Sequence, residues 1–194
     1  MLDVVEWGGG NTGSLERALS RLGLEFRRVR EPSALAGGNP LVLPGVGSFA
    51  GVMRGLSERG LDAALTSAVR AGRPLLGVCV GLQVLFERSE ESPGVRGLCL
   101  LGGEVVRFAK GKVPQVGWNS LEPAEGADWP RGHAYFVNSY FARPATASDV
   151  LYISDYSGPF CAAVRRGNVT AFQFHPEKSG PFGSSLLKRW ADAL

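Results

Sequence analysis

Residues 74–87 read Pro74-Leu-Leu-Gly-Val-Cys79-Val-Gly-Leu-Gln83-Val-Leu-Phe-Glu87 and indicate a strand, a sharp turn and a helix. The apolar run over 74–78 predicts a buried strand, and the apolar spacing over 81–87 predicts a helix. Cys79 stands at the turn between them, flanked by Gly77 and Gly81. This is the pattern of a nucleophile elbow, in which the glycines let strand and helix approach closely and the apical side chain projects into solvent.

Cys79 has two interpretations at this point. In an elbow, the first backbone N–H groups of the following helix, at its positive dipole end, favour a thiolate and can hold a developing oxyanion. Free cysteine is also among the most buried residue types, so a structural cysteine on a core strand is the alternative. The rest of the chain is needed to choose between the two.

Composition indicates an ordinary globular protein. Of the 194 residues, 44% are hydrophobic and 20% are charged, which suits one domain with a substantial core. The net charge is +3 and the basic residues are scattered, so we expect no nucleic-acid partner. The opening MLDVVEWGGG has neither a basic n-region nor a long apolar run, so we expect no signal peptide and no membrane association. Three cysteines without a C-x-x-C pair fit a reducing cytoplasm.

Strands and helices alternate in the first half of the chain. Strands are predicted near 2–7, 24–29, 41–43 and 74–78, and helices near 12–22, with Asn11 or Thr12 as its cap, 49–56, 61–71 and 81–87. The second half has β-rich runs at 105–108, 134–141 and 150–154, a hairpin over 160–174, and a final helix over 184–194. These patterns predict an α/β, single-domain three-layer sandwich with a mostly parallel central sheet, and antiparallel β-rich additions in the second half.

Two glycine-rich segments follow predicted strands. Gly8-Gly-Gly-Asn11 lacks the G-x-G-x-x-G pattern and a P-loop Lys-Ser/Thr, so a tight strand-to-helix turn is favoured over a phosphate loop. Pro44-Gly-Val-Gly47 and Cys79 both follow predicted parallel strands. In such sheets, sites gather at the carboxyl ends of the strands, so we expect these two segments to meet.

The candidate partner of the cysteine lies in Ala171-Phe-Gln-Phe-His175-Pro-Glu177-Lys-Ser179. Histidine is the usual general base for a thiol. Pro176 ends the strand, so Glu177 can turn toward His175, accept its N–H and fix its tautomer. The alternatives are a solvated pair on a surface turn and a metal site, for which no other His or Cys has suitable local spacing. We expect the second histidine, His133, to be structural or exposed.

Two of these motifs together carry a resemblance. Gly77-Val-Cys79-Val-Gly-Leu-Gln83 and Gln173-Phe-His175-Pro-Glu177-Lys-Ser179 resemble the motifs of the triad-type, class I glutamine amidotransferases. Four further motifs resemble those of one branch of that family, the glutaminase subunits of imidazole glycerol phosphate synthases: Gly8-Gly-Gly-Asn11, Pro44-Gly-Val-Gly-Ser-Phe49, Val113-Pro-Gln-Val-Gly-Trp-Asn119 and Tyr135-Phe-Val-Asn-Ser-Tyr140. The likeness extends over nearly the whole chain and implies one amidotransferase domain over residues 1–194.

The resemblance implies hydrolysis of L-glutamine to glutamate and ammonia, with Cys79 as nucleophile, His175 as acid and base, and Glu177 as the residue that orients His175. The other expected site residues are the N–H groups of Val80 and of Val46 or Gly47 for the oxyanion, and Gln83, Ser139 and Tyr140 for the substrate. Gln83 follows Cys79 by one helical turn, so it should face the same substrate. We expect no cofactor and no metal.

The resemblance also implies a partner, a (β/α)₈-barrel cyclase subunit that receives the ammonia in a heterodimer. The pair would make imidazole glycerol phosphate and aminoimidazole carboxamide ribonucleotide in histidine biosynthesis. Candidates for the docking face are Asn11, Gln115, Trp118 and Asn119, although Trp118 suits a core position equally well. Gln115 and Asn138 stand where that branch usually has histidine.

Three other functions remain to be separated from this one. They are an amidotransferase for another synthase, a stand-alone cysteine hydrolase such as a γ-glutamyl hydrolase, and a non-catalytic regulatory protein.

Cys99 lies in an apolar run and Cys161 on a hairpin strand, and we expect both to be small core residues.

Overall fold

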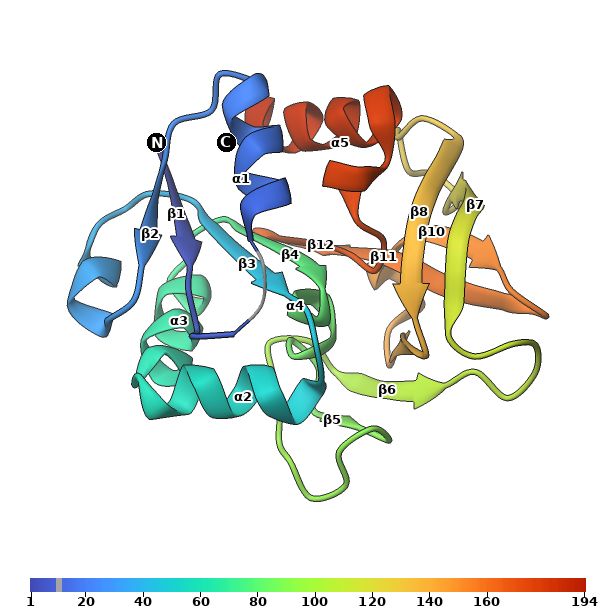
Figure 1. Ribbon diagram of the computed structural model, residues 1–194, viewed down its shortest axis with the longest axis horizontal. Coiled ribbons are helices and arrows are strands. Elements are labelled where there is room, and N and C mark those ends of the chain that lie inside the picture. The colour runs from blue at the N-terminus through green and yellow to red at the C-terminus, as the bar shows by residue number, and fades with distance from the viewer. Residues whose placement is uncertain (10–11) are drawn as a thin grey trace.

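The computed structural model describes residues 1–9 and 12–194 (Figure 1). The helices are α1 (Gly13–Arg21), α2 (Phe49–Glu58), α3 (Leu61–Arg70), α4 (Val80–Gln83) and α5 (Gly180–Asp192), with short 3₁₀ helices η1 (Pro32–Ala36), η2 (Ala147–Asp149) and η3 (Pro176–Lys178). The strands are β1 (Leu2–Val5), β2 (Phe26–Val29), β3 (Leu41–Gly45), β4 (Leu75–Cys79), β5 (Arg88–Ser89), β6 (Gly103–Arg107), β7 (Gln115–Pro123), β8 (Gly132–Asn138), β9 (Tyr140–Pro144), β10 (Val150–Asp155), β11 (Pro159–Arg166) and β12 (Val169–Phe172).

The strands form one mixed sheet in the order β2-β1-β3-β4-β12-β11-β10-β7-β8. The first five strands are parallel to one another, and each pairing from β12 onward is antiparallel. Strands β9, β6 and β5 extend the sheet from β11 along a side branch. The predicted α/β fold, parallel in its first half with antiparallel additions in its second, is confirmed.

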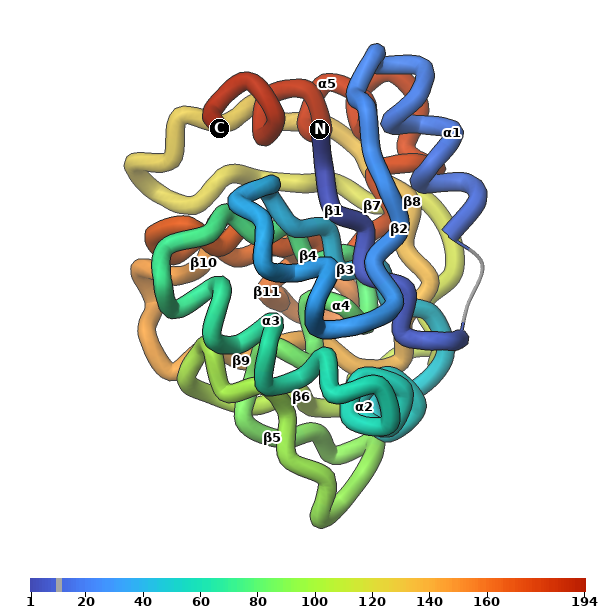
Figure 2. Tube along the Cα trace, turned by 90° about the vertical axis from the view of Figure 1, so that its left-hand side faces the viewer, coloured from blue at the N-terminus to red at the C-terminus, as the bar shows by residue number. Residues whose placement is uncertain are grey.

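Helices cover both faces of the parallel half of the sheet. Helices α1 and α5 lie on one side, and α2 and α3 lie on the other (Figures 1 and 2). The amphipathic pattern explains this placement, because Leu15 and Leu19 of α1 and Val52 and Leu56 of α2 are all buried. The result is the predicted three-layer arrangement.

The sheet order brings distant segments to one edge. Strand β4 lies between β3 and β12, with Gly45 opposite Cys79 and Phe172 opposite Val78. Because all three strands run parallel, the segments after Gly45, at Cys79 and after Phe172 emerge side by side. The carboxyl edge of the sheet therefore joins three motifs that are far apart in the sequence.

The helix predicted over 81–87 is the clearest wrong boundary. Helix α4 ends at Gln83. The next carbonyl groups are used elsewhere, because Val84 O accepts from Leu98 N at 2.8 Å and Leu85 O accepts from Leu100 N at 2.9 Å. Contacts from a distant loop replace the bonds that would have continued the helix.

Other differences are smaller. Helix α5 begins at Gly180 rather than at residue 184, because proline is tolerated in a first helical turn and Pro181 stands there. Thr12 precedes α1, but its hydroxyl donates to Glu16 Oε1 at 2.9 Å instead of capping the helix. Asn11, the alternative cap, lies outside the described residues. Strand β7 was not predicted. The predicted hairpin is confirmed as the antiparallel pair β11–β12.

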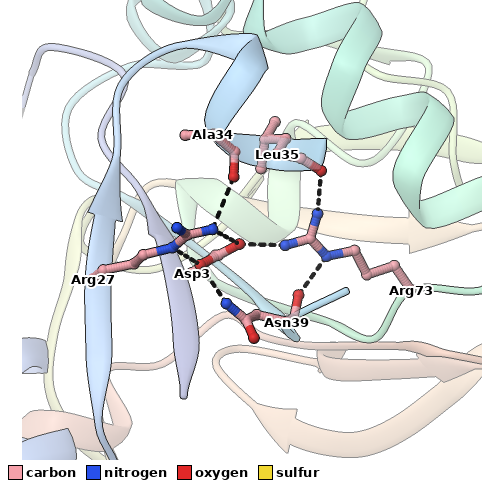
Figure 3. A network of polar contacts seen from close by, with 6 residues as sticks. All are labelled: Asp3, Arg27, Ala34, Leu35, Asn39 and Arg73. Atoms are coloured by element: carbon pink, nitrogen blue, oxygen red, sulfur yellow. Dashed lines mark hydrogen bonds and ion pairs between the residues drawn. The ribbon is translucent and has the colours of Figure 1, made fainter. Parts of the chain in front are cut away.

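A buried polar cluster lies at the opposite, amino-terminal edge of the sheet (Figure 3). Asp3 of β1 is 0% exposed and accepts hydrogen bonds from Arg27 at 2.6 Å and from Asn39 at 3.1 Å. Arg73, before β4, also binds the Asp3 carboxylate, and its Nη1 donates to Leu35 O at 2.7 Å. One carboxylate thus joins four segments of the parallel half.

The two cysteines outside the elbow differ from each other. Cys161 is buried, as predicted, and burial raises the pKa of its thiol to about 12. Cys99 is only partly buried, has a φ of 51°, and its Sγ lies 3.2 Å from Arg96 Nε, so the prediction of a core position is wrong for it. In the part of the chain that the structure describes, no helix has the length and apolarity to cross a bilayer.

Candidate active site

The turn after β4 has the geometry of an elbow. Cys79 has a φ of 55° and a ψ of −114°, a conformation that residues other than glycine rarely adopt. A Cβ built on Gly81 would lie 2.0 Å from Leu43 O, and one on Gly45 would lie 2.2 Å from Gly81 N. Close backbone approach therefore requires glycine here, as the spacing of Gly77 and Gly81 predicts.

The side chain of Cys79 faces a half-open cavity and does not project freely into solvent. Its residue is 5% exposed, but it lines a cavity of ≈350 Å³ together with His175 and the predicted oxyanion and substrate residues. This differs from the expected projection into solvent, because the 137–140 segment and the residues after β3 and β12 wall in the apex of the turn. The volume is within the range of small-ligand sites.

His175 and Glu177 are arranged in series with the cysteine. His175 Nδ1 lies 2.8 Å from Glu177 Oε1, so Nε2 is the ring nitrogen that is not engaged by Glu177. Burial alone would lower the pKa of His175, but hydrogen bonds to Cys79 and to Glu177 outweigh it and raise the pKa to about 9. The structure thus brings the three predicted triad residues together.

The backbone around His175 is fixed by its neighbours. Its N–H donates to Tyr135 O at 3.0 Å, and its carbonyl accepts from Ser179 Oγ at 2.7 Å. Ser179 Oγ in turn accepts from Tyr135 N at 2.9 Å. Strand β12 ends at Phe172 and η3 begins at Pro176, so the chain turns between them and both side chains of the His-Pro-Glu motif reach the same site.

Val46, Gly47 and Val80 line the same cavity as Cys79. Val80 begins α4, whose first N–H groups have no partner within the helix. Because α4 has only 4 residues, these N–H groups act locally and not through a long helix dipole. Gly47 has a φ of 99°, a backbone conformation that glycine adopts readily and other residues rarely do.

The predicted substrate residues also line the cavity. Gln83 is buried and donates from Nε2 to Tyr140 O and to Gln173 Oε1, both at 3.0 Å. The side-chain oxygen of Gln83, Oε1, is therefore the atom of this amide that could bind a ligand. Ser139 and Tyr140 are partly buried at the junction of β8 and β9, on the wall formed by residues 137–140.

Sequence reasoning missed Glu91, a carboxylate on the cavity wall. Its Oε2 accepts a hydrogen bond of 2.6 Å from Phe49 N at the start of α2. Helix N-termini favour carboxylates, so this contact holds the side chain in place. No local motif marks Glu91, because its partner is 42 positions away in the chain.

Of the predicted docking residues that the structure describes, only Trp118 is largely exposed. Trp118 is 59% exposed, which excludes the core alternative, and the exposed side chains of Val116 and Val137 belong to the same β-hairpin. Asn119 is partly buried and donates to Asp155 O at 2.6 Å, and Gln115 is buried. Asn11 lies outside the described residues.

Gln115 and Asn138 are directly opposite each other on β7 and β8. Both are buried, and the carbonyl oxygen of each lacks a hydrogen-bond donor among the described residues. Asn138 Nδ2 donates to Tyr140 O at 3.0 Å. His133, on β8, is exposed, as expected.

Comparison with known proteins agrees with this geometry. Residues 3–193 match the family model described as glutamine amidotransferase class-I. A solved structure described as a glutamine amidotransferase superposes with a TM-score of 0.80 at 26% identity, covering 98% of this chain and 97% of that chain. The PurLQS structure from Thermotoga maritima shares the fold, with a TM-score of 0.75 at 18% identity and coverage of 99% and 97%.

Curated relatives narrow the family further. Proteins named imidazole glycerol phosphate synthase subunit HisH are 44% identical in Rhodopirellula baltica, over 100% of this chain and 98% of theirs, and 42% identical in Carboxydothermus hydrogenoformans, over 100% of both. The relative of that name in Deinococcus radiodurans is 43% identical over 98% and 93%. The chain belongs to the class I glutamine amidotransferases and, within them, to the HisH family.

Proposed function

We propose that this protein is the glutaminase subunit of an imidazole glycerol phosphate synthase, with one amidotransferase domain over residues 1–194, working in the cytoplasm. The observation that carries the proposal is the series Cys79, His175 and Glu177, with the cysteine at the apex of an elbow and facing a cavity. A nucleophile, a base in contact with it and a residue that orients the base are what acyl transfer from an amide requires.

In the first half of the reaction, the Cys79 thiolate attacks the side-chain carboxamide carbon of L-glutamine. The N–H groups of Val80 and of Val46 or Gly47 stabilise the tetrahedral oxyanion. The C–N bond then breaks while His175, as imidazolium, gives its proton to the departing ammonia. This leaves a γ-glutamyl thioester on Cys79 and a neutral His175.

In the second half, His175 removes a proton from water, which attacks the thioester and releases glutamate and the thiolate. Glu177 keeps the imidazole in the tautomer that this needs. Ser139 and Tyr140 hold the amino-acid end of glutamine, together with the carbonyl oxygen of Gln83. We add Glu91 to this group, since its carboxylate lines the cavity and suits the substrate's α-ammonium.

Ammonia released into water is protonated and lost, so we propose that it passes directly to a (β/α)₈-barrel cyclase subunit in a heterodimer. That subunit makes imidazole glycerol phosphate and aminoimidazole carboxamide ribonucleotide in histidine biosynthesis. The docking face that we propose is centred on Trp118, with Val116 and Val137 beside it, since exposed apolar side chains gathered on one hairpin are typical of interaction surfaces.

The test is glutamate release from glutamine, measured on the purified chain alone and again with the cyclase subunit and its nucleotide ligand. Little activity alone and a large rise in the complex is the expected result. Cys79→Ser should abolish the activity but keep complex formation, and Cys161→Ser is the matched control for loss of a thiol elsewhere. Vigorous turnover without the partner would indicate a stand-alone hydrolase instead, and unchanged activity in Cys79→Ser would rule out the mechanism.

A further inference from the structure

Gln173 is a buried amide that no step of the proposed mechanism uses. It lies two residues before His175, is 0% exposed, and its backbone N–H donates to Ala162 O at 2.9 Å. Its side-chain Nε2 lies 3.9 Å from Cys79 Sγ, which is a long N–H···S hydrogen bond. The amide thus contacts the sulfur of the nucleophile from within the protein core.

The neighbouring side chain fixes which end of this amide faces the sulfur. Gln83 Nε2 donates to Gln173 Oε1 at 3.0 Å, and the same nitrogen donates to the backbone carbonyl of Tyr140. A backbone carbonyl only accepts, so the NH₂ group of Gln83 must point this way. Because the oxygen of Gln173 then meets a donor, its NH₂ group is the end turned toward Cys79. The reversed orientation would oppose two NH₂ groups.

A buried thiolate needs hydrogen-bond donors in place of the water that it has lost. His175 supplies one contact to the sulfur, and the amide of Gln173 supplies another. A hydrogen-bond donor at the sulfur stabilises negative charge there, so the amide of Gln173 suits a thiolate better than a neutral thiol.

We propose that Gln173 is a positioning residue that donates to the Cys79 thiolate and, through Gln83, connects the nucleophile to the wall of the substrate cavity. The inference rests on the proposed function only in taking Cys79 as the nucleophile. It assigns Gln173 no contact with the substrate, so its removal should change the reactivity of the thiol more than the binding of glutamine.

The test is the pH dependence of Cys79 alkylation by iodoacetamide in the full chain, compared between wild type and Gln173→Met, which keeps the side-chain length but has no donor. Alkylation is quantified on the Cys79 peptide by mass spectrometry, because the partly exposed Cys99 will also react. We expect the profile to move to higher pH and the rate at pH 7 to fall about five-fold, the effect of one lost hydrogen bond. For glutamine hydrolysis, kcat should fall similarly and KM should change less, because Gln83 loses its bond to Gln173 but keeps the one to Tyr140 O.

Two further variants make the result decisive. Gln173→Glu keeps the shape but turns a carboxylate toward the sulfur, so alkylation at pH 7 should fall further than in Gln173→Met. Thr170→Val removes a buried polar group from β12, just before Gln173 in the chain but opposite Leu76 rather than at Cys79, and should leave the profile unchanged.

The inference is overturned if Gln173→Met alkylates as wild type does, or, should that variant not fold, if Gln173→Glu does. It is also overturned if Thr170→Val shifts the profile equally. A shifted profile in a protein that never hydrolyses glutamine, with or without its partner, would support the role of Gln173 and refute the proposed function.

Discussion

Removing the carboxylate of Asp3 should destabilise the fold more than the loss of a surface ion pair would. In Asp3→Ala, the guanidinium of Arg73, whose side chain is 7% exposed, keeps its backbone acceptors such as Leu35 O but loses the one carboxylate that pairs with it among residues 1–9 and 12–194. Leaving one charge of a buried pair unpaired costs about 3–5 kcal/mol. Arg27, the other cationic partner, is much more exposed, so Arg27→Ala should cost far less.

The measurement is the free energy of unfolding from urea denaturation of wild type, Asp3→Ala, Arg27→Ala and the double variant Asp3→Ala/Arg73→Met. With a slope of about 2 kcal/mol per molar, the Asp3→Ala midpoint should fall on the order of 2 M. The double variant should recover part of the loss, because it also removes the unpaired cation. An Asp3→Ala midpoint equal to that of Arg27→Ala would show that the reasoning is wrong.

The same cluster predicts a pH dependence. Burial alone would raise the pKa of Asp3, but hydrogen bonds from Arg27 and Asn39 and the nearby positive charges hold it below the ordinary value of 3.8. Its contribution to stability is therefore complete above that value and is lost as the pH falls through the lowered pKa. The stability difference between wild type and Asp3→Asn should shrink below about pH 4.

Three more predictions concern the site and its surroundings. Trp118→Ala should weaken binding of the cyclase subunit by about 2 kcal/mol in calorimetry, with the unfolding midpoint of the free chain unchanged. Glu177→Gln should lower the pKa of His175 from about 9, and NMR titration of the imidazole ring measures this. In wild type, the raised pKa contributes stability that is complete below pH 6.5 and is lost as the pH rises through about 9, and this contribution should be smaller in the variant. Gly81→Ala places a Cβ 2.0 Å from Leu43 O and should cost at least about 1–3 kcal/mol in urea unfolding, whereas Gly38→Ala meets nothing within 4 Å and should be tolerated.

Local contacts explain why much of the site could be predicted from the sequence. The backbone segments around the turn approach so closely that Gly77 and Gly81 have no room for a Cβ, so the spacing of these glycines around Cys79 predicts the elbow. His175 and Glu177 are separated by one proline, and the short turn that it starts brings their side chains within 2.8 Å. In motifs of this kind, the residues that determine the local geometry lie within the motif itself.

Features that depend on distant partners could not be predicted in this way. The side chain of Glu91 is positioned by a hydrogen bond from Phe49, and that of Gln173 by one from Gln83, and both partners are far away in the sequence. The early end of α4 has the same origin, since loop residues after Gly97 take the carbonyls that a longer helix would have used. Trp118 could be placed on the surface only once β7 was known to pair with β8.

The backbone conformation of Cys79 has a consequence for the evolution of the chain. A non-glycine residue held at such a φ and ψ loses about 1–3 kcal/mol, and glycine would remove that strain but has no thiol. Natural selection for stability alone would thus replace the residue that we propose as the nucleophile. A cysteine at this apex is a trade-off in which the protein gives up part of its stability to hold a sulfur over the cavity.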